Sequence, residues 1–356
     1  MVNSARTFLF CCGLLFLSGC SAITNEHLFQ MPILDKDGKS VIVWPKPPDV
    51  PRYAFIGHIY GESNSIESAS KKAPMSRFLE ALVGVEQNVE AMINLVQPQQ
   101  ITTDNKERIY VTDSARQAVF VFDEKLSRFS IWDEATTSIP FLSPVGITFA
   151  NDSIWVTDSE LSLVYQIKQN GELIQSIGRG VLNRPTGVTY DAVRQRLFVA
   201  DTADSKIRIF NIKGELIDEW GSFGQRKGEF NRPTFLAYRG GRLYVADSLN
   251  ARIQVFDSLG NSVLSLGQRG LYVGDFSRPK GVAVDSDSNL YISESYYDHV
   301  LVYDDRGRLL MSLGGSGFEA GRFLQPTGIW VDNHDRVFVS DMLNSRISIF
   351  QYLGED

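Results

Sequence analysis

Histidine and cysteine, the residues that most often carry nucleophilic or zinc chemistry, are scarce in this chain of 356 residues. The four histidines are His27, His58, His299 and His334. A catalytic zinc site needs three protein ligands that converge on one point. Only His299 and His334 fall in neighbouring units of the repeat described below, and they occupy different places in those units. We therefore predict no metal site.

The acidic and glycine-rich segments do not match known calcium-binding or phosphate-binding motifs either. The segment Asp285-Ser-Asp-Ser-Asn289 looks like the start of a calcium loop. An EF-hand requires glycine at the sixth position and glutamate at the twelfth, where this chain has Leu290 and Tyr296. The segment is typical of a β-turn. Because no phosphate-binding loop or nucleophile elbow is present either, we predict no catalytic residue and no cofactor.

The third cysteine follows a short export signal. Arg6 precedes an apolar run from Phe8 to Leu17, which is shorter than the roughly 20 residues of a spanning helix and is typical of a secretory signal. The segment Leu17-Ser18-Gly19-Cys20 resembles the lipobox of bacterial lipoproteins. The resemblance implies that residues 1–19 are removed and that Cys20 carries palmitate-type acyl chains. The alternative is an ordinary signal with a cysteine there by chance.

Lipidation at Cys20 sets the expected location. Cys11 and Cys12 leave with the signal, so the mature chain keeps no thiol for a disulfide, a metal or a nucleophile. Two or three acyl chains anchor a protein almost permanently, because each buried methylene adds about 0.8 kcal/mol. Ser21 follows the cysteine, and by resemblance to Gram-negative sorting rules this favours the outer membrane. We expect a lipid-anchored envelope protein facing either the periplasm or the cell exterior.

The charge of the mature chain disfavours nucleic acid as a partner. Without residues 1–19, 34 Lys and Arg stand against 42 Asp and Glu, which gives a formal charge of −8. An acidic protein gains nothing from the counterion release that drives binding to phosphate backbones. We therefore expect no nucleic-acid partner.

A repeat of 43 to 47 residues organises the rest of the chain. Each unit holds four short segments rich in β-branched and aromatic residues and separated by turn residues. The first segment opens at Pro98, Pro144, Pro185, Pro233, Pro279 and Pro326, and the second ends at Asp113, Asp158, Asp201, Asp247, Glu294 and Asp341. Six units of four strands predict an all-β fold, a six-bladed β-propeller.

The last unit lacks a fourth strand, because only six residues follow Phe350. The missing strand is predicted upstream, at Tyr53–Tyr60, since the following Gly61 matches the glycines that end other fourth strands. We expect this N-terminal strand to pair with the last blade and close the ring. Closure removes the open strand edges that invite aggregation.

The repeat resembles a known family. Pro185-Thr-Gly-Val188, Leu197-Phe-Val-Ala-Asp201 and Lys206-Ile-Arg-Ile-Phe210 are similar to NHL repeats. The segment Trp44-Pro-Lys-Pro-Pro48 and the strand after it look like bacterial six-bladed propeller lipoproteins. The resemblance covers residues 44–350. It implies the fold but no single activity, because NHL propellers serve as binding modules, scaffolds and sometimes lyases.

The chain divides into three parts. Residues 1–19 are the predicted signal, residues 20–51 a lipidated, proline-rich tether, and residues 52–356 the propeller with an insertion at 62–84. In the insertion, Met75, Phe78, Leu79 and Leu82 recur at helical spacing. This spacing predicts a short helix that caps a propeller face, docks a partner or packs locally before the first blade.

The six repeated acids have two interpretations. They could surround the channel and hold a cation, or each carboxylate could accept hydrogen bonds from backbone N–H groups and fix the turn after the second strand. Because every blade carries such an acid and every blade has this turn, a shared structural role is the simpler explanation. We therefore favour the structural role.

Departures from the repeat are better guides to function. The residues before the six prolines are Gln97, Ser143, Arg184, Arg232, Arg278 and Gln325. They enter the innermost strands, so three consecutive blades are expected to place arginine around one mouth of the channel. Arginine binds carboxylate or phosphate in bidentate fashion. The alternative is that each arginine pairs with the acid of its own or the next blade.

Blade five carries a second departure. Its second-to-third-strand turn reads Glu294-Ser-Tyr-Tyr-Asp-His299, and the loop before the blade holds Tyr272. Both loops belong to the face of the inter-blade connections. We expect Tyr272, Tyr296, Tyr297 and His299 to cluster beside Arg278, unless they are ordinary loop variation. Tyrosine and arginine are the usual anchors of binding surfaces.

These features favour a binding protein over an enzyme. Phe235 stands where four other blades have glycine, and its ring is expected to narrow the channel, which argues against a deep catalytic shaft. We predict a membrane-anchored propeller that binds other envelope proteins or an anionic ligand through one face. The alternative is a metal-dependent hydrolase or lyase of the six-bladed kind, with calcium held by Asp and Glu.

Overall fold

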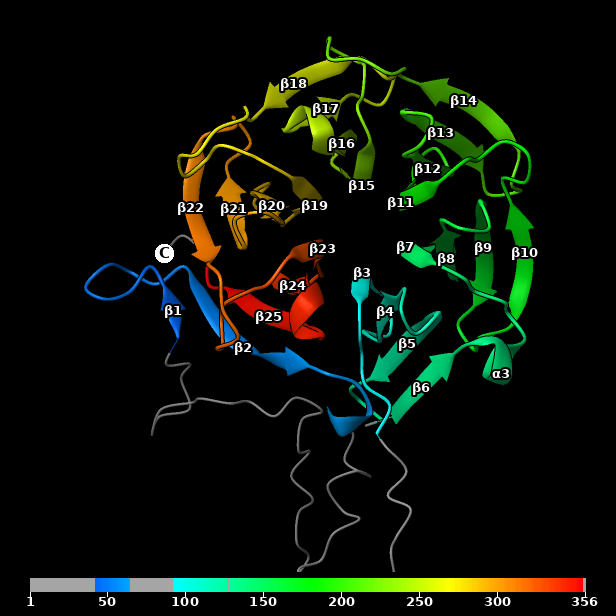
Figure 1. The fold of residues 1–356 in the computed structure, drawn as a ribbon, viewed down its shortest axis with the longest axis horizontal. Helices are drawn as coiled ribbons and strands as arrows, with labels where there is room; N and C mark the ends of the chain where they lie inside the picture. Colours follow the sequence, from blue (N-terminus) through cyan, green and yellow to red (C-terminus); the bar gives the residue numbers. More distant parts are fainter. Residues whose placement is uncertain (1–41, 65–91, 127, 355–356) are drawn as a thin grey trace, which may run out of the picture.

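The computed structural model describes residues 42–64, 92–126 and 128–354. In these ranges the strands form six antiparallel sheets that stand around a central axis like the blades of a propeller (Figure 1). Five sheets have four strands and the sixth has five. The predicted all-β, six-bladed β-propeller is confirmed.

The first three blades each run from an innermost to an outermost strand. Blade 1 consists of β3 (Pro98–Thr103), β4 (Ile109–Asp113), β5 (Ala118–Asp123) and β6 (Arg128–Trp132), followed by the short helix α3 (Glu134–Thr137). Blade 2 consists of β7 (Pro144–Ala150), β8 (Ser153–Asp158), β9 (Leu163–Lys168) and β10 (Leu173–Ile177). Blade 3 consists of β11 (Pro185–Asp191), β12 (Arg196–Asp201), β13 (Lys206–Asn211) and β14 (Leu216–Trp220).

The next blades repeat this order. Blade 4 consists of β15 (Pro233–Arg239), β16 (Arg242–Asp247), β17 (Arg252–Phe256) and β18 (Ser262–Leu266), with the 3-10 turn η2 (Ser248–Asn250). Blade 5 consists of β19 (Pro279–Val284), β20 (Leu290–Glu294), β21 (His299–Tyr303) and β22 (Leu309–Gly314). Blade 6 begins with β23 (Pro326–Val331), β24 (Arg336–Asp341), η3 (Met342–Asn344) and β25 (Arg346–Tyr352). Every opening proline and every terminal acid falls where the repeat predicts it.

The N-terminal strand completes blade 6, as predicted. Strand β2 (Tyr53–Ile59) runs antiparallel to β25, with Tyr53 opposite Tyr352 and Ile59 opposite Ile347. The 3-10 turn η1 (Glu62–Asn64) follows. Because the first and last strands of the propeller are neighbours in one sheet, the chain closes its own ring (Figure 1).

Part of the predicted tether also belongs to the propeller. Strand β1 (Val43–Trp44) pairs with β2 at the outer edge of blade 6, and the Trp44 ring meets Phe350 edge-on at 5.4 Å between centroids. The signal, Cys20 and the helix predicted around Met75 lie outside the described residues. Within the ranges given above, no helix is long and apolar enough to cross a membrane.

Apolar packing and hydroxyl groups join neighbouring blades. The core lies between the sheets, where side chains such as Trp155, Phe198 and Tyr291 are fully buried. Closer to the axis, a hydroxyl of one blade donates to a carbonyl on the first strand of the next blade. The pairs of hydroxyl donor and carbonyl acceptor are Thr112 and Val145, Ser159 and Pro185, Thr202 and Pro233, Ser248 and Pro279, Ser293 and Thr327, and Thr327 and Pro98. These hydrogen bonds form a ring around the channel.

Glycine on the innermost strands permits this close approach. A Cβ added at Gly187 would lie 2.6 Å from the Thr234 carbonyl oxygen of the next blade, which is closer than real Cβ atoms come. Phe235 takes the corresponding position in blade 4 and is buried.

Candidate anion-binding site

The repeated acids organise the face that carries the inter-blade loops. In blade 2, the Asp158 carboxylate accepts hydrogen bonds from the N–H groups of Leu142 and Ser143, just before the innermost strand. It also accepts from Glu160 and Leu161, just after the second strand. The predicted structural role is confirmed, and it extends to the inter-blade loop. One carboxylate therefore fixes two loops of this face.

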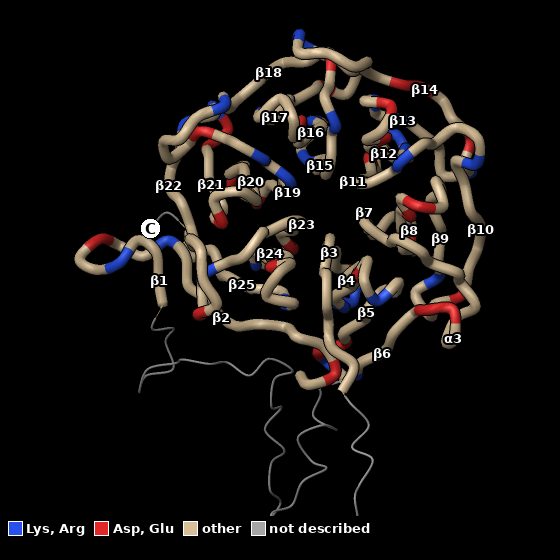
Figure 2. The backbone as a smooth tube through the Cα atoms, viewed as in Figure 1, with Lys and Arg blue, Asp and Glu red and all other residues tan. Residues whose placement is uncertain are grey.

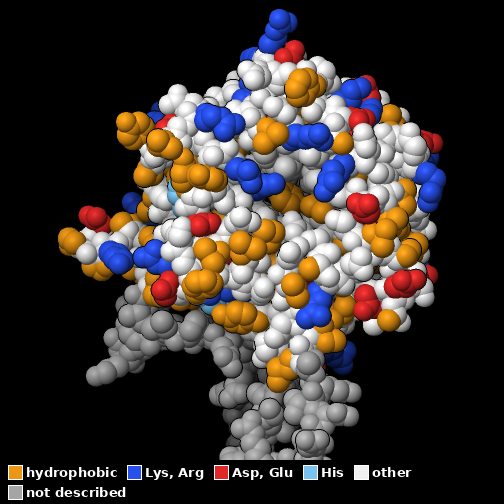
Figure 3. All heavy atoms as spheres, in the orientation of Figure 1, with side chains coloured by type: hydrophobic (Ala, Val, Ile, Leu, Met, Phe, Trp, Pro, Cys, Tyr) orange, Lys and Arg blue, Asp and Glu red, His pale blue; other side chains and the backbone are white. Residues whose placement is uncertain are grey.

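The same contacts position two of the three predicted arginines. The N–H of Arg184 donates to Asp201 at 3.0 Å, and the N–H of Arg278 donates to Glu294 at 2.9 Å. The third, Arg232, has a left-handed φ of 56°. All three side chains are exposed. Basic positions lie at the inner ends of the connections into β11, β15 and β19 (Figure 2), and basic side chains gather near the centre of this face (Figure 3).

No described acidic side chain forms an ion pair or hydrogen bond with these three guanidinium groups. The internal ion pairs of the propeller are made by other arginines. They are Arg196–Asp191, Arg208–Asp201, Arg252–Asp247, Arg336–Asp332 and Arg346–Asp341. The alternative prediction was that each arginine pairs with the acid of its own or the next blade. No such ion pair occurs among the described residues, although the positive charge of Arg278 opposes the rise that burial causes in the pKa of Glu294. Arginines on the third strands of blades 3, 4 and 6 occupy Asp201, Asp247 and Asp341. Glu294 of blade 5 instead accepts hydrogen bonds from backbone N–H groups.

Lys280 is a fourth basic group at this mouth, and it is not among the residues predicted from the sequence. It directly follows Pro279 and is half-buried. Burial lowers the pKa of its ammonium group, and the positive charges of Arg278 and Arg184 lower it further. Groups from blades 3 and 5 therefore act on one lysine. We call Arg184, Arg232, Arg278 and Lys280 the basic mouth.

A signal for Lys280 exists in the repeat. The residue after the opening proline is Gln99, Val145, Thr186, Thr234, Lys280 or Thr327 in successive blades. Lysine is the one charged residue in this series. Comparing the second position of each innermost strand, as well as the residue before the proline, would have identified it.

Three of the four predicted aromatic residues come together. The Tyr296 and Tyr297 rings meet edge-on at 5.0 Å, and Tyr297 stacks on His299 at 5.9 Å. The Tyr297 hydroxyl donates to the Gly270 carbonyl at 2.9 Å. Tyr272 lies on the same loop as Gly270 but is 84% exposed, and none of the described aromatic rings contacts it. The cluster therefore consists of Tyr296, Tyr297 and His299.

This cluster adjoins the basic mouth through the backbone. The Ser295 N–H donates to the Arg278 carbonyl at 3.2 Å, which places the tyrosine turn beside the arginine. Burial lowers the pKa of His299, so its ring is neutral near pH 7. The arrangement can bind an anionic group with the basic mouth and pack an apolar group against the tyrosines.

The described residues offer no ligand set for the alternative, metal-dependent function. No group of three or more His, Cys, Asp and Glu side chains in these ranges is arranged to hold a metal ion. His334 lies in the turn between β23 and β24 and contacts Glu107 at 3.3 Å. That turn belongs to the opposite face from His299, as the repeat predicted.

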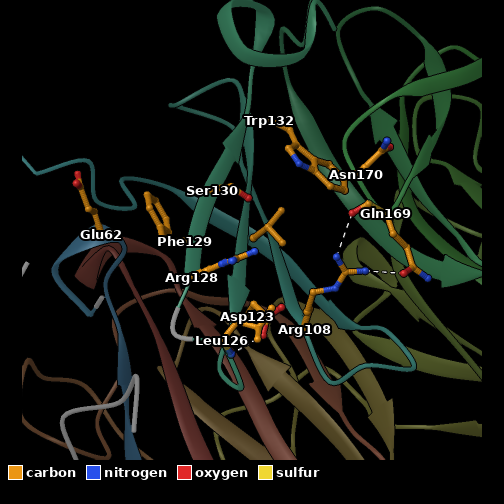
Figure 4. Close-up of a pocket in the computed structure, with 11 residues that line it drawn as sticks. Glu62, Arg108, Asp123, Leu126, Arg128, Phe129, Ser130, Trp132, Gln169 and Asn170 are labelled. Carbon is orange, nitrogen blue, oxygen red and sulfur yellow. Dashed lines mark hydrogen bonds between the residues drawn. The ribbon is translucent and has the colours of Figure 1, made fainter. Parts of the chain in front are cut away.

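A groove of about 540 Å³ lies between blades 1 and 2, away from the basic mouth (Figure 4). Phe129 and Trp132 contribute to its lining. Arg108 is held internally, because it donates to Gln169 and pairs with Asp104 at 2.6 Å. None of the predicted site residues lines this groove.

Comparisons with known proteins agree with the fold. The NHL repeat family model matches residues 230–256, which run from the loop before blade 4 to the end of β17. No curated protein matches the sequence. An auxiliary nutrient binding protein from Bacteroides thetaiotaomicron is similar in structure, with a TM-score of 0.58, 14% identity, and coverage of 73% of this chain and 70% of that one.

Two further solved structures show the same architecture. A Bacteroides thetaiotaomicron protein of unknown function has a TM-score of 0.58 and 15% identity, over 74% of this chain and 71% of that one. Virginiamycin B lyase from Staphylococcus aureus has a TM-score of 0.54 and 14% identity, over 73% of this chain and 97% of that one. At these identities the similarity concerns the fold alone. The chain is a six-bladed β-propeller that contains an NHL repeat.

Proposed function

We propose that this propeller is a binding protein that holds an anionic ligand or partner at its basic mouth. The observation that carries the proposal is a set of four basic side chains, one of them half-buried, that form no ion pair with a described acidic side chain. Like charges that share a partly desolvated site raise the free energy of the unbound protein. A bound anion relieves that repulsion.

The chemistry of the site favours a ligand with more than one carboxylate or phosphate oxygen. Guanidinium groups form paired hydrogen bonds with such groups, and lysine adds a point charge. The formal net charge of the sequence is −7, and it repels long polyanions that extend beyond the mouth. A compact multivalent anion, or the acidic end of a protein segment, fits both conditions.

Isothermal titration with citrate and pyrophosphate at low salt tests this proposal. The test compares the wild type with R184A, R278A and K280M. Each variant is expected to weaken binding by about tenfold, the loss of one charge-assisted contact of about 1.4 kcal/mol. R306A is the matched control, because Arg306 is an exposed arginine in the β21–β22 turn on the opposite face. Equal affinity in all four variants would refute the assignment.

We also propose that Cys20 anchors the propeller to an envelope membrane, with the outer membrane as the expected site. The lipobox-like segment before Cys20 supports this location. Labelling cells with an alkyne analogue of palmitate and separating the membranes tests it. Wild-type protein should carry the label and sediment with the outer membrane, whereas C20S should be unlabelled and leave the membrane fraction. A labelled C20S variant would contradict the anchor.

The nutrient-binding description of one structural neighbour is consistent with a binding role, but it is an analogy of fold. The proposal itself depends on the basic mouth.

A further inference from the structure

A second cavity lies on the channel axis at the other end of the propeller. It measures about 260 Å³ and is lined by the far ends of the innermost strands β7, β11, β15, β19 and β23. Its aromatic lining residues are Phe149, Tyr190, Tyr238 and Trp330, and Arg239 is its cationic one. The basic mouth lies at the opposite ends of these strands. The two sites therefore share no residue.

Trp330 departs from the repeat at this cavity. It occupies the fifth position of its innermost strand, where the other blades have Thr102, Thr148, Thr189, Ala237 and Ala283. Its indole N–H donates to Thr103 Oγ1 of blade 1 at 3.0 Å, which fixes the orientation of the ring. The side chain is only half-buried. A large, oriented and partly exposed ring therefore stands where the other blades keep a small side chain.

Arg239 is the second departure. The seventh position of the innermost segment is Asp104, Ala150, Asp191, Arg239, Asp285 or Asp332 in successive blades. Arg239 is exposed, and its Nη1 donates to the Val284 carbonyl at 3.2 Å. No described acidic side chain forms an ion pair with it. The acids at the same position of the two neighbouring blades are occupied. Asp191 pairs with Arg196, and Asp285 accepts hydrogen bonds from the side chains of Asn289 and Tyr291.

We infer that this cavity binds a small aromatic carboxylate, with the ring on Trp330 and the carboxylate on Arg239. Small-molecule sites are concave, mostly apolar and supplied with a few polar groups, as this cavity is. An apolar cavity of about 150 Å³ is enough for benzene, so the volume here accommodates one ring with a short substituent. Ring stacking holds the planar group, and the guanidinium selects the carboxylate.

Three probes separate the two contacts. Phenylacetate carries both groups, benzyl alcohol keeps the ring without the charge, and hexanoate keeps the charge without the ring. Saturation-transfer NMR and titration calorimetry on the purified propeller should give the tightest binding for phenylacetate. Absence of phenylacetate binding to the wild type would overturn the proposal.

Variants assign the contacts to residues. W330T installs the residue that three other blades carry and is expected to weaken phenylacetate at least tenfold, whereas W330F keeps a ring and should stay within about threefold. R239A should remove the preference for phenylacetate over benzyl alcohol. Unchanged affinity in W330T would overturn the inference. If W330T does not fold, the test rests on R239A. An R239A variant that still prefers phenylacetate over benzyl alcohol would then overturn the inference.

The same titrations distinguish this site from the basic mouth. R278A and K280M are expected to leave phenylacetate binding within twofold of the wild type. Loss of phenylacetate binding in these variants, with full binding in R239A, would assign the ligand to the other mouth and overturn the inference. The two sites are independent, so phenylacetate should bind at the cavity even if citrate does not bind at the basic mouth.

Discussion

At the scale of single residues, charged side chains divide into two groups with different surroundings. The repeated acids, such as Asp158, are fully buried and bound to backbone N–H groups or to internal arginines. The side chains of Arg184, Arg232, Arg278 and Lys280 form no ion pair with an acidic side chain among the described residues. The repeated acids stabilise the fold, and the side chains of the basic mouth are available to a ligand.

Asp158 allows the structural role to be measured. D158A leaves four N–H groups of two loops without their acceptor, and we expect the free energy of unfolding to fall by about 2–4 kcal/mol. Chemical denaturation measures the change. D305A, at an exposed turn residue, is the control and should stay within about 0.5 kcal/mol of the wild type. Similar effects of the two substitutions would contradict the role of the repeated acid.

Lys280 predicts how anion binding depends on pH. Its pKa is lowered by burial and by two arginines, so it loses its charge at a lower pH than an ordinary lysine. Arginine stays protonated throughout. Citrate affinity of the wild type should therefore already fall at a pH below 10.5, the ordinary lysine pKa, while K280M, already weaker, should change little. A parallel pH dependence of the two proteins in calorimetry would exclude Lys280 from the site.

Among the secondary-structure elements, strand β2 closes the ring by pairing with β25 of blade 6. Phe55 of β2 is buried in blade 6 and meets the Phe350 ring edge-on at 5.6 Å. We expect F55A to lower the free energy of unfolding by about 3–5 kcal/mol, the usual range for a buried phenylalanine. Deletion of residues 52–61 should abolish cooperative unfolding. V50A, at a residue 63% exposed, is the control. A folded, monomeric deletion variant would contradict closure by β2.

His58 makes this closure sensitive to acid. Burial, helped by the positive charge of Arg346, lowers the pKa of His58 to about 3. Below the ordinary histidine pKa the unfolded chain takes up a proton that the folded chain refuses, so stability is present above about pH 6.5 and is lost toward pH 3.

A comparison with H58N isolates this contribution. The stability difference between the wild type and H58N should shrink by about 1.4 kcal/mol for each pH unit below 6.5. Denaturation curves at several pH values measure it, and taking the difference removes the effect of the acidic residues common to both proteins. A difference that is independent of pH would show that His58 does not titrate in this way.

At the scale of the whole molecule, the sequence was sufficient for the ring but not for its two mouths. The prolines and acids repeat every blade, so the number of blades and the position of β2 could be derived from their spacing. Strand β1 was missed because it has two residues within a proline-rich segment. Lys280 and Trp330 were missed because their importance depends on which strand positions face the channel.

The internal pairing of arginines was also beyond the sequence. Only the register of β16 with β17 and of β24 with β25 places Arg252 opposite Asp247 and Arg346 opposite Asp341. Once these pairs are known, the arginines of the basic mouth are left without an ion pair among the described residues. The two ends of one channel therefore differ in chemistry, with four basic groups at one end and an aromatic cavity at the other.

Photo-crosslinking in intact cells tests whether the basic mouth is the binding surface of the propeller. A photoreactive amino acid replaces Tyr297 beside the basic mouth or, as the control, Val193, which is 87% exposed on the opposite face. Mass spectrometry identifies the adducts. We predict one main adduct from position 297 that disappears when Arg184, Arg232 and Arg278 are replaced by alanine. An adduct that survives this triple substitution, or that forms equally from position 193, would contradict binding at the basic mouth.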